Sequence, residues 1–341
     1  MEYRPNQMRL AGAFVALLVA AACSDINHAP TAPSVVPPDQ SPSFSKSPDG
    51  MEVLRGAVIH PTVGAVQRAT HAARPTRSSN LYYYGGIGGV GVETAPQVYV
   101  VFYGSQWTNN DPSGEAGIYQ SFLQGVFGSG WLNSVTQYCQ GLASGTYFCN
   151  GAGTPAGNSN GVYAGYWYDN TVSAPSQPTQ SQLASEAVRA AAHFGNTTSS
   201  LNASAQYVIA TAHGNNSSGF ATQYCAYHSS TSSSYGNIAY TNLPYMTDGG
   251  ASCGANFNGL GPNAGITIVG GHELAETITD QFPNGGWLDS RGAENGDKCA
   301  WITSGHQGAS ANTTLSTGTF PVQSLWSNAF NSNSGGCVLS Y

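Results

Sequence analysis

One stretch of the sequence, residues 270–282, combines apolar residues with ionisable side chains at a fixed spacing. It reads GGHELAETITDQF. His272 and Glu276 lie four residues apart, so a helix brings their side chains onto one face, one turn from each other. The stretch therefore predicts a helix over about 263–281 that presents an imidazole beside a carboxylate.

That pair of side chains is suited to hold a metal ion. A His followed four residues later by a Glu gives the same two-point attachment as the two His of the HExxH metallopeptidase motif. Glu273 stands directly after His272, where those enzymes keep their general base. We expect His272 and Glu276 to be metal ligands and Glu273 to be the catalytic base.

The acidic segment that follows, GWLDSRGAENGDKCAW at 286–301, is the expected source of a third ligand. A catalytic zinc ion takes three protein ligands and keeps a fourth position open for water. We favour Asp297, because a bridged Cys299 would fix the geometry of its loop. Glu294, on the same loop, is a candidate additional ligand.

Two other residues are weaker candidates. Asp280 lies eight residues after His272, roughly 12 Å along a helix axis. It is therefore expected to cap or orient rather than to ligate. His228 follows a strand-like segment and is either an additional ligand, an oxyanion partner or a hydrogen-bonded structural histidine.

Acidic residues are concentrated around the helix motif. From residue 81 onward the chain has twelve Asp and Glu residues, and six of them lie between 272 and 299. A solvated acidic face would usually carry interspersed Lys or Arg, so this concentration indicates a bound cation. Zinc is the expected cofactor. Because Glu276 replaces the second His and leaves the ion less able to acidify water, calcium is the alternative.

Basic residues are scarce in the same region. After residue 80 the Lys and Arg residues are only Arg189, Arg291 and Lys298. Nucleic-acid binding needs a basic surface, so this composition argues against a nucleic-acid partner. The expected partner is a peptide or protein substrate, and the sequence does not determine the oligomeric state.

The N-terminal part has the pattern of an exported chain. Residues 1–22 read as a signal peptide, and VAAAC resembles a bacterial lipobox, which predicts a lipidated Cys23 at the cell envelope. An ordinary signal peptide with a chance Cys is the alternative. Residues 23–80 are Pro/Ser-rich and predict a disordered tether or pro-segment, which leaves 81–341 as the metal-binding domain.

The cysteines agree with export. Six follow Cys23, an even number that indicates disulfides in an exported chain. Of the fifteen possible connectivities we expect neighbour pairing. The expected bonds are Cys139–Cys149, Cys225–Cys253 and Cys299–Cys337.

The hydrophobic patterns alternate between strand and helix. The predicted strands are 96–104, 162–168, 206–214, 237–246 and, near the end, 319–327, and the predicted helices are 112–128, 179–194 and 263–281. Parallel crossover units followed by an edge strand suggest an α/β (α+β) fold with a mixed sheet. This order resembles the upper lobe of zincin metallopeptidases, where the fourth strand is an edge that lines the cleft and the next helix carries the ligands. An irregular, disulfide-linked part is expected to follow.

Several short blocks resemble the EXORDIUM / phosphate-induced protein 1 family of secreted proteins and its bacterial counterparts. The blocks are VYVVFYGSQW (98–107), YCAYHSS (224–230), GGHELAETITD (270–280), ENGDKC (294–299) and Cys337. By match to the family pattern the carried-over positions are His272, Glu273, Glu276, Glu294, Asp297 and Cys299, with His228 in a further block. The family has Thr-Asn-Pro where this chain has Thr279-Asp280-Gln281, so Asp280 gains no support. The resemblance implies an extracellular or cell-wall location and names no substrate.

Together these patterns predict a secreted, metal-dependent hydrolase, most simply a zincin-like metallopeptidase with an HExxE helix. The alternative is an exported, non-catalytic binding or cell-surface protein with a structural calcium ion. A glycan-active protein is a weaker reading, because the carboxylates surround a His on one helix instead of flanking a sugar.

Overall fold

The computed structural model describes residues 45–46, 52–53 and 80–341. The predicted signal peptide and Cys23 lie outside the described residues, as does most of the predicted tether. Within the tether segment, β1 (Ser45–Lys46) and β2 (Glu52–Val53) pair antiparallel with each other. In the described part of the chain, no helix has both the length and the apolar character needed to span a membrane.

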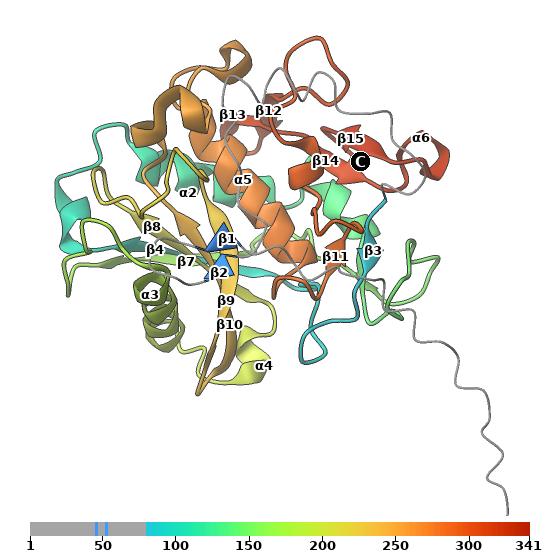
Figure 1. Ribbon diagram of the computed structural model, residues 1–341, viewed down its shortest axis with the longest axis horizontal. Coiled ribbons are helices and arrows are strands. Elements are labelled where there is room, and N and C mark those ends of the chain that lie inside the picture. Colours follow the sequence, from blue (N-terminus) through green and yellow to red (C-terminus); the bar gives the residue numbers. More distant parts are fainter. Residues whose placement is uncertain (1–44, 47–51, 54–79) are drawn as a thin grey trace, which may run out of the picture. The chain divides into compact units, whose positions relative to one another are not determined.

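A five-stranded mixed sheet is the centre of the fold (Figure 1). In spatial order its strands are β7 (Tyr163–Asp169), β4 (Gln97–Tyr103), β8 (Ala205–Thr211), β10 (Gly236–Leu243) and β9 (Tyr227–Ser233). The first four are parallel to one another, and β9 pairs antiparallel with β10. This confirms the expected mixed α/β architecture.

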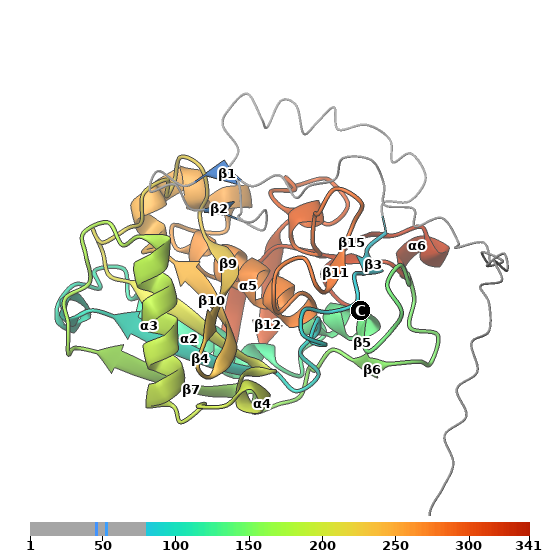
Figure 2. The ribbon, with the colours of Figure 1, turned by 60° about the horizontal axis from the view of Figure 1, so that its bottom comes forward.

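Helices cover both faces of the sheet. The helices are α2 (Glu115–Val126), α3 (Gln180–His193), α4 (Ser199–Asn202), α5 (Ala264–Thr279) and α6 (Phe330–Asn333). Figures 1 and 2 show α3 on one face and α5 on the other. Parallel strands covered in this way are apolar on both sides, as β4 illustrates. Its residues Val98, Val100 and Phe102 join the core with α2 and α5, and the intervening Tyr99, Val101 and Tyr103 join the core with α3.

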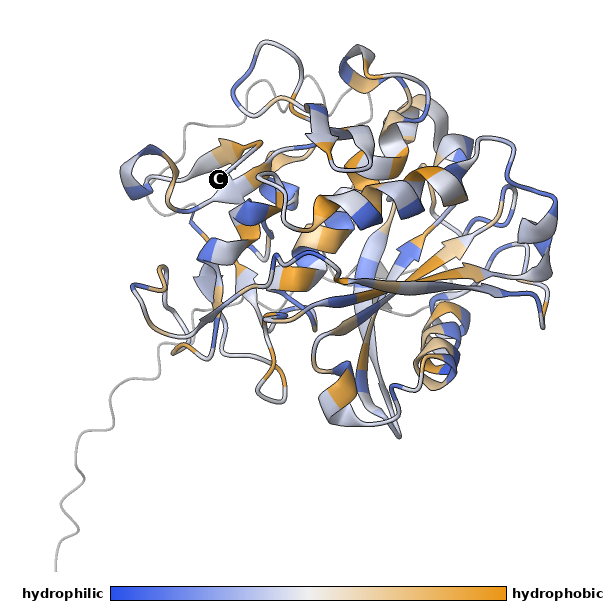
Figure 3. Ribbon diagram, turned by 180° about the vertical axis from the view of Figure 1, so that it is seen from behind, coloured by the Kyte–Doolittle hydropathy of each residue, from blue (hydrophilic) through white to orange (hydrophobic). Residues whose placement is uncertain are grey.

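Local signals in the sequence predicted the positions of helices α2, α3 and α5 correctly. The side chain of Thr179 caps α3 in a capping box with Gln182, as its position predicted. Gly195 then adopts a φ of 80°, which glycine tolerates and which ends the helical path. Figure 3 shows hydrophobic residues along the central helix and the strands, and hydrophilic residues along most of the peripheral loops.

The prediction of the sheet edge was wrong. The predicted fourth strand corresponds to β10, which lies inside the sheet, and the edge is β9, which was not predicted. The sequence of β9, YHSSTSS, has little of the apolar character that identifies a buried strand. A strand with a neighbour on one side only tolerates such polarity.

The C-terminal part consists of short hairpins and turns beside α5. Its pairs are β12 (Ala311–Leu315) with β13 (Gly318–Val322) and β14 (Leu325–Ser327) with β15 (Gly336–Val338). Two further pairs use earlier parts of the chain: β3 (Tyr82–Tyr83) with β11 (Trp287–Leu288), and β5 (Cys139–Gln140) with β6 (Thr154–Pro155). The single strand predicted over 319–327 is therefore two strands, because Gln323 and Ser324 interrupt the pairing.

Short 3-10 helices complete the chain. They are η1 (Ser105–Thr108), η2 (Leu132–Gln137), η3 (Met246–Cys253), η4 (Phe257–Gly259) and η5 (Asp297–Cys299). Within residues 80–341 the six cysteines form three disulfides, which confirms the predicted pairs Cys139–Cys149, Cys225–Cys253 and Cys299–Cys337. These bonds suggest an extracellular or otherwise oxidising environment.

Candidate metal centre

The helix α5 places three of the predicted site residues in the interior. Every residue of this helix is buried, and the side chains of His272, Glu273 and Glu276 are 0% exposed. Two glycines allow this burial. A Cβ on Gly270 would lie 2.4 Å from Cε2 of Tyr119, and one on Gly271 would lie 3.2 Å from a ring atom of α2, so both let α2 approach the helix backbone.

The first group of candidate ligands is the one predicted from the sequence. His272, Glu276 and Asp297 offer ligand atoms that all lie within 4.8 Å of one another. Nε2 of His272 is 2.9 Å from Oε1 of Glu276 and 3.9 Å from Oδ1 of Asp297. The structure therefore brings the acidic loop back onto the helix, as expected.

A second group shares one residue with the first. His228, Glu276 and Glu294 also offer ligand atoms within 4.8 Å of one another. Nε2 of His228, on β9, is 2.9 Å from Oε2 of Glu294 and 3.8 Å from Oε2 of Glu276. All three residues are buried, so this group could hold a metal ion in the same way as the first. His228 and Glu294, which the sequence marked as additional candidates, thus belong to the centre.

Unsatisfied polar atoms gather in the centre, as they would in a candidate cation site. Within the described part of the chain, both carboxylate oxygens of Glu273, Oε2 of Glu276, Oε1 of Glu294 and Nε2 of His272 are buried and lack hydrogen-bond partners. A buried polar atom without a partner usually costs 1 kcal/mol or more, roughly, so such atoms are seldom retained without a purpose. Nitrogen and oxygen donors of this kind could hold a metal ion, and they do not fix which metal it is.

Neighbouring residues hold the ligands in place. Nδ1 of His272 lies 3.1 Å from Oε1 of Gln323, whose amide nitrogen donates to the carbonyl of Gly296 at 2.8 Å. This contact leaves Nε2 of His272 directed toward the ligands, as in metal sites generally. The backbone N–H of Asp297 donates to Oε1 of Glu276 at 2.9 Å, which joins the loop to the helix.

The ligand loop packs closely against the helix. A Cβ on Gly296 would lie 2.7 Å from Nδ1 of His272 and 2.9 Å from Oε1 of Glu276, so only glycine fits there without displacement. Nδ2 of Asn295 donates to Oγ1 of Thr279 at 2.7 Å and to the carbonyl of Ala275 at 3.0 Å. These contacts fix the loop along one side of α5.

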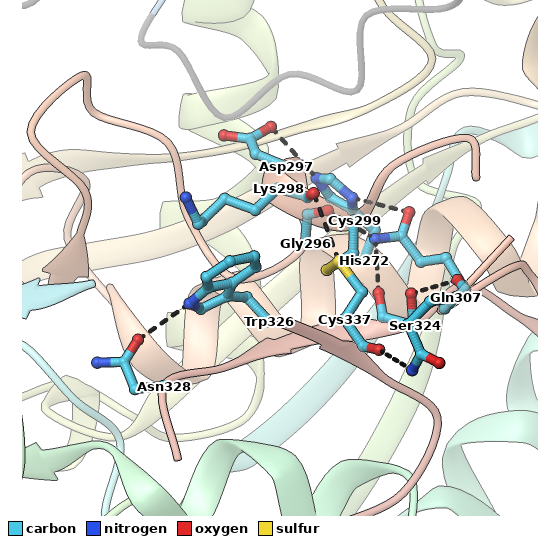
Figure 4. The surroundings of a disulfide bond; sticks show 12 residues. His272, Gly296, Asp297, Lys298, Cys299, Gln307, Ser324, Trp326, Asn328 and Cys337 are labelled. Carbon is cyan, nitrogen blue, oxygen red and sulfur yellow. Dashed lines mark hydrogen bonds and ion pairs between the residues drawn. A yellow bond between two sulfur atoms is a disulfide. The ribbon is translucent and has the colours of Figure 1, made fainter. Parts of the chain in front are cut away.

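A disulfide secures the other end of this loop. Cys299 directly follows the stretch that carries Asp297 and is bonded to Cys337 on β15. Figure 4 shows this bond with His272 and Asp297 beside it and Lys298 extended toward Trp326. The Lys298 ammonium lies 4.3 Å from the Trp326 ring centre and 3.1 Å from the Asp289 carboxylate. The positive charge of Lys298 is therefore balanced by Asp289 on the same loop, and it does not offset the negative charge of the metal ligands.

Asp280 orients the chain after the helix instead of joining the ligands. Its carboxylate accepts hydrogen bonds from the backbone N–H groups of Asn284 and Gly285 at 2.7 and 2.9 Å, and from that of Gly286. Burial raises its pKa to about 7, and these donors oppose the shift. The expected orienting role thus agrees with the structure.

Burial controls the protonation of the centre. It lowers the pKa of His228 to about 3 and that of His272 below its usual value, so both imidazoles are neutral, the form that binds metals. Burial, followed by the charge of Glu276, raises the pKa of Asp297 to about 7. Burial also raises the pKa of Glu273, Glu276 and Glu294 well above the usual carboxyl range. Without a nearby cation, these acids favour their protonated forms.

Comparison with known proteins adds no assignment. The chain matches no protein family model, no curated protein and no solved structure. The centre is therefore interpreted from its own geometry.

Two residues of the centre were missed by the sequence analysis. Gln323 comes from a segment that reads as strand, and no local signal connects it with a helix 51 residues earlier. Gly296 stands between Asn295 and Asp297, and a glycine between two polar residues is ordinarily a turn signal. Its position among carboxylates was the available hint that the backbone comes close to a ligand.

Proposed function

We propose that the protein is a metal-dependent hydrolase of the zincin type, most simply a metallopeptidase. The observation that carries the proposal is Glu273. Its carboxyl is fully buried beside the ligands and belongs to neither ligand group, and among the described residues the backbone of His228 approaches it while no side-chain donor does. A site that only held an ion would gain nothing from this costly group, whereas a hydrolase needs it as a general base.

The residues of the centre have different roles in the proposed hydrolysis. When bound, a zinc ion would supply Lewis-acid chemistry, which polarises a carbonyl oxygen and makes water more acidic. His272, Glu276 and Asp297 would hold it. Glu273 takes the proton of the attacking water and passes it to the leaving amine, a role favoured by its raised pKa. Asp297, whose side chain is 22% exposed, marks the side from which water enters.

The edge strand β9 supports a peptide substrate. It carries His228 into the centre and forms one end of the sheet as far as the chain is described. An extended peptide can add to such an edge through backbone hydrogen bonds. A substrate placed along β9 would have its backbone beside the catalytic base, because the backbone of His228 on this strand approaches Glu273. Relationship to the EXORDIUM family and attachment at the cell envelope through Cys23 are part of this proposal.

The test uses the full chain and a pool of quenched-fluorescence peptides. We expect stoichiometric zinc by elemental analysis, and we expect Glu273→Gln to keep the zinc while kcat/KM falls roughly 100-fold or more. Glu93→Gln is the matched control, because Glu93 is an equally buried glutamate bonded to Gln206 outside the centre. Full hydrolysis by Glu273→Gln, or a chain without metal, would refute the proposal.

A second candidate function is a non-catalytic protein with a structural ion. It is favoured by the burial of His272 and Glu276, since structural sites are closed and catalytic sites keep an open position. Its signature would be calcium in the purified chain, a lower melting temperature after chelation and no hydrolysis of the peptide pool by the wild type.

A further inference from the structure

Two residues of the second ligand group, His228 and Glu294, have no part in the proposed hydrolysis. His228 and Glu294 are 1% exposed and come from β9 and the ligand loop. The two histidines approach different oxygens of the Glu276 carboxylate. Oε1 of Glu276 faces His272, and Oε2 faces His228. A carboxylate whose two oxygens face two separate histidines has the arrangement of a bridging ligand.

The distances within each group fit one ion. Ligands held at zinc bond lengths in a tetrahedron are roughly 3.3 Å apart. In the first group the distances from Nε2 of His272 to its two carboxylates are 2.9 and 3.9 Å. In the second group the distances from Nε2 of His228 are 2.9 and 3.8 Å. The two groups therefore surround two comparable positions, one on each side of the Glu276 carboxylate.

The charges of the centre also fit two ions. Four carboxyl groups meet here, from Glu273, Glu276, Glu294 and Asp297, beside two neutral histidines. Among residues 80–341, no Lys or Arg offsets them. Arg189 pairs with Asp169 and Glu186, Lys298 pairs with Asp289, and Arg291 is exposed. Two ions would place a cation beside the ligands of both groups, whereas one ion would leave the histidine and the acid of the other group without one.

We propose that the centre holds two divalent cations bridged by the carboxylate of Glu276. The first is bound by His272 and Asp297, and the second by His228 and Glu294. Paired sites of this kind place their ions about 3.5–4 Å apart, a spacing that one bridging carboxylate spans. This proposal rests on the proposed function and deepens it, because it makes the hydrolase a two-metal enzyme in which the edge strand supplies a ligand.

A single-ion centre is the competing arrangement. Glu294 also forms a hydrogen bond with Asp280, so it could keep a proton there and leave His228 as a hydrogen-bonding neighbour. In that case only His272, Glu276 and Asp297 would bind metal. The two arrangements predict different metal counts for the same chain.

The experiment is elemental analysis of the full chain dialysed against zinc, with circular dichroism as the check of folding. We expect about two zinc ions in the wild type, about one in His228→Ala and in His272→Ala, and fewer than one in Glu276→Gln. The control is His306→Ala, which changes an exposed histidine and should keep both ions. One ion in a folded wild-type chain, unchanged in His228→Ala, would overturn the two-ion proposal and leave the proposed hydrolase intact. Absence of metal would overturn both.

A second measurement needs no variant. The wild-type chain loaded with Mn²⁺ should give the electron paramagnetic resonance spectrum of a coupled pair, because the two ions share a carboxylate. A spectrum of isolated Mn²⁺ at full loading would overturn the proposal even if the histidine variants failed to fold.

Discussion

The sheet separates two groups of buried acids that are stabilised in opposite ways. On the α3 side, Asp169 and Glu186 form an Arg-paired cluster with Arg189, at distances of 2.6 and 2.7 Å. On the α5 side, the acid–histidine cluster consists of His228, His272, Glu273, Glu276, Glu294 and Asp297. The first cluster contains its own cation. The second contains none from the protein, although it buries more carboxyl groups.

Proton sharing completes the Arg-paired cluster. Glu186 forms a hydrogen bond with Asp169, which raises the pKa of Glu186 and contributes to lowering that of Asp169. One proton on Glu186 and one charge on Arg189 thus leave the cluster neutral. Around Glu276 the same burial occurs without an arginine beside the carboxyl groups. The difference teaches that the Arg-paired cluster is neutralised by an arginine and a shared proton, whereas the acid–histidine cluster has no cation of the protein and is where we expect a metal.

Removal of the metal should change the free energy of unfolding more than any other change considered below. It should act on the acid–histidine cluster alone. An ion present at a thousand times its dissociation constant stabilises a fold by about 4 kcal/mol, so a chelator should lower the free energy of unfolding by that order. Urea unfolding with and without the chelator measures it. Glu276→Gln should abolish the response, and an equal response in that variant would contradict the comparison.

Loss of the arginine should disrupt only the Arg-paired cluster. Arg189→Met leaves Asp169 charged and 0% exposed, which we expect to cost about 2–3 kcal/mol, the lower end for a buried pair because Arg189 is 40% exposed. Urea unfolding is again the measurement, with Arg291→Met as the exposed control. The chelator response should stay at the wild-type value, and a reduced response would show that the two clusters are coupled.

A methyl group at Gly296 should disturb the acid–histidine cluster sterically. Gly296→Ala places a Cβ 2.7 Å from Nδ1 of His272, and we expect a loss of about 2 kcal/mol together with weaker zinc binding. Thermal unfolding and zinc titration test both effects. The matched control is Gly117→Ala on α2, where a Cβ meets nothing within 4 Å and should be neutral or slightly stabilising. Equal zinc affinity in Gly296→Ala and the wild type would refute the close packing.

The smallest effect should be the pH dependence of the Arg-paired cluster. Burial raises the pKa of Glu186 to about 8, so its contribution to stability is full below the unfolded value near 4.5 and is lost as pH rises through about 8. Screening near Arg189 reduces it to on the order of 1 kcal/mol. Urea unfolding of the wild type and of Glu186→Gln should give a difference in stability that favours the wild type at pH 5 and shrinks as pH rises through about 8. A difference between the two chains that grows as pH rises would have the wrong sign for Glu186, whereas the lowered pKa values of His228 and His272 reduce stability toward low pH equally in both chains.

The sequence predicts the local parts of this structure better than the distant contacts. The apolar runs predicted β4, β7 and β8, and the spacing of His272 and Glu276 predicted α5. These elements could be predicted because each of them depends on residues close together in the sequence. The strand β9 was missed because Ser and Thr carry no burial signal, although Gly236, at the turn into β10, was a hairpin signal. The shared use of Glu276 by two groups could not be predicted, since it depends on where β9 and the loop meet the helix.

The disulfide at the ligand loop sets the order in which the centre can form. Cys337 follows every other residue of the centre in the sequence, and its bond to Cys299 holds the loop that carries Asp297. A chain under synthesis therefore has His228, His272 and Glu276 available long before their loop can be fastened. The loop can be fastened only after the chain has been made as far as Cys337 and has met an oxidant, so the metal capture that we propose would come late in the life of the molecule.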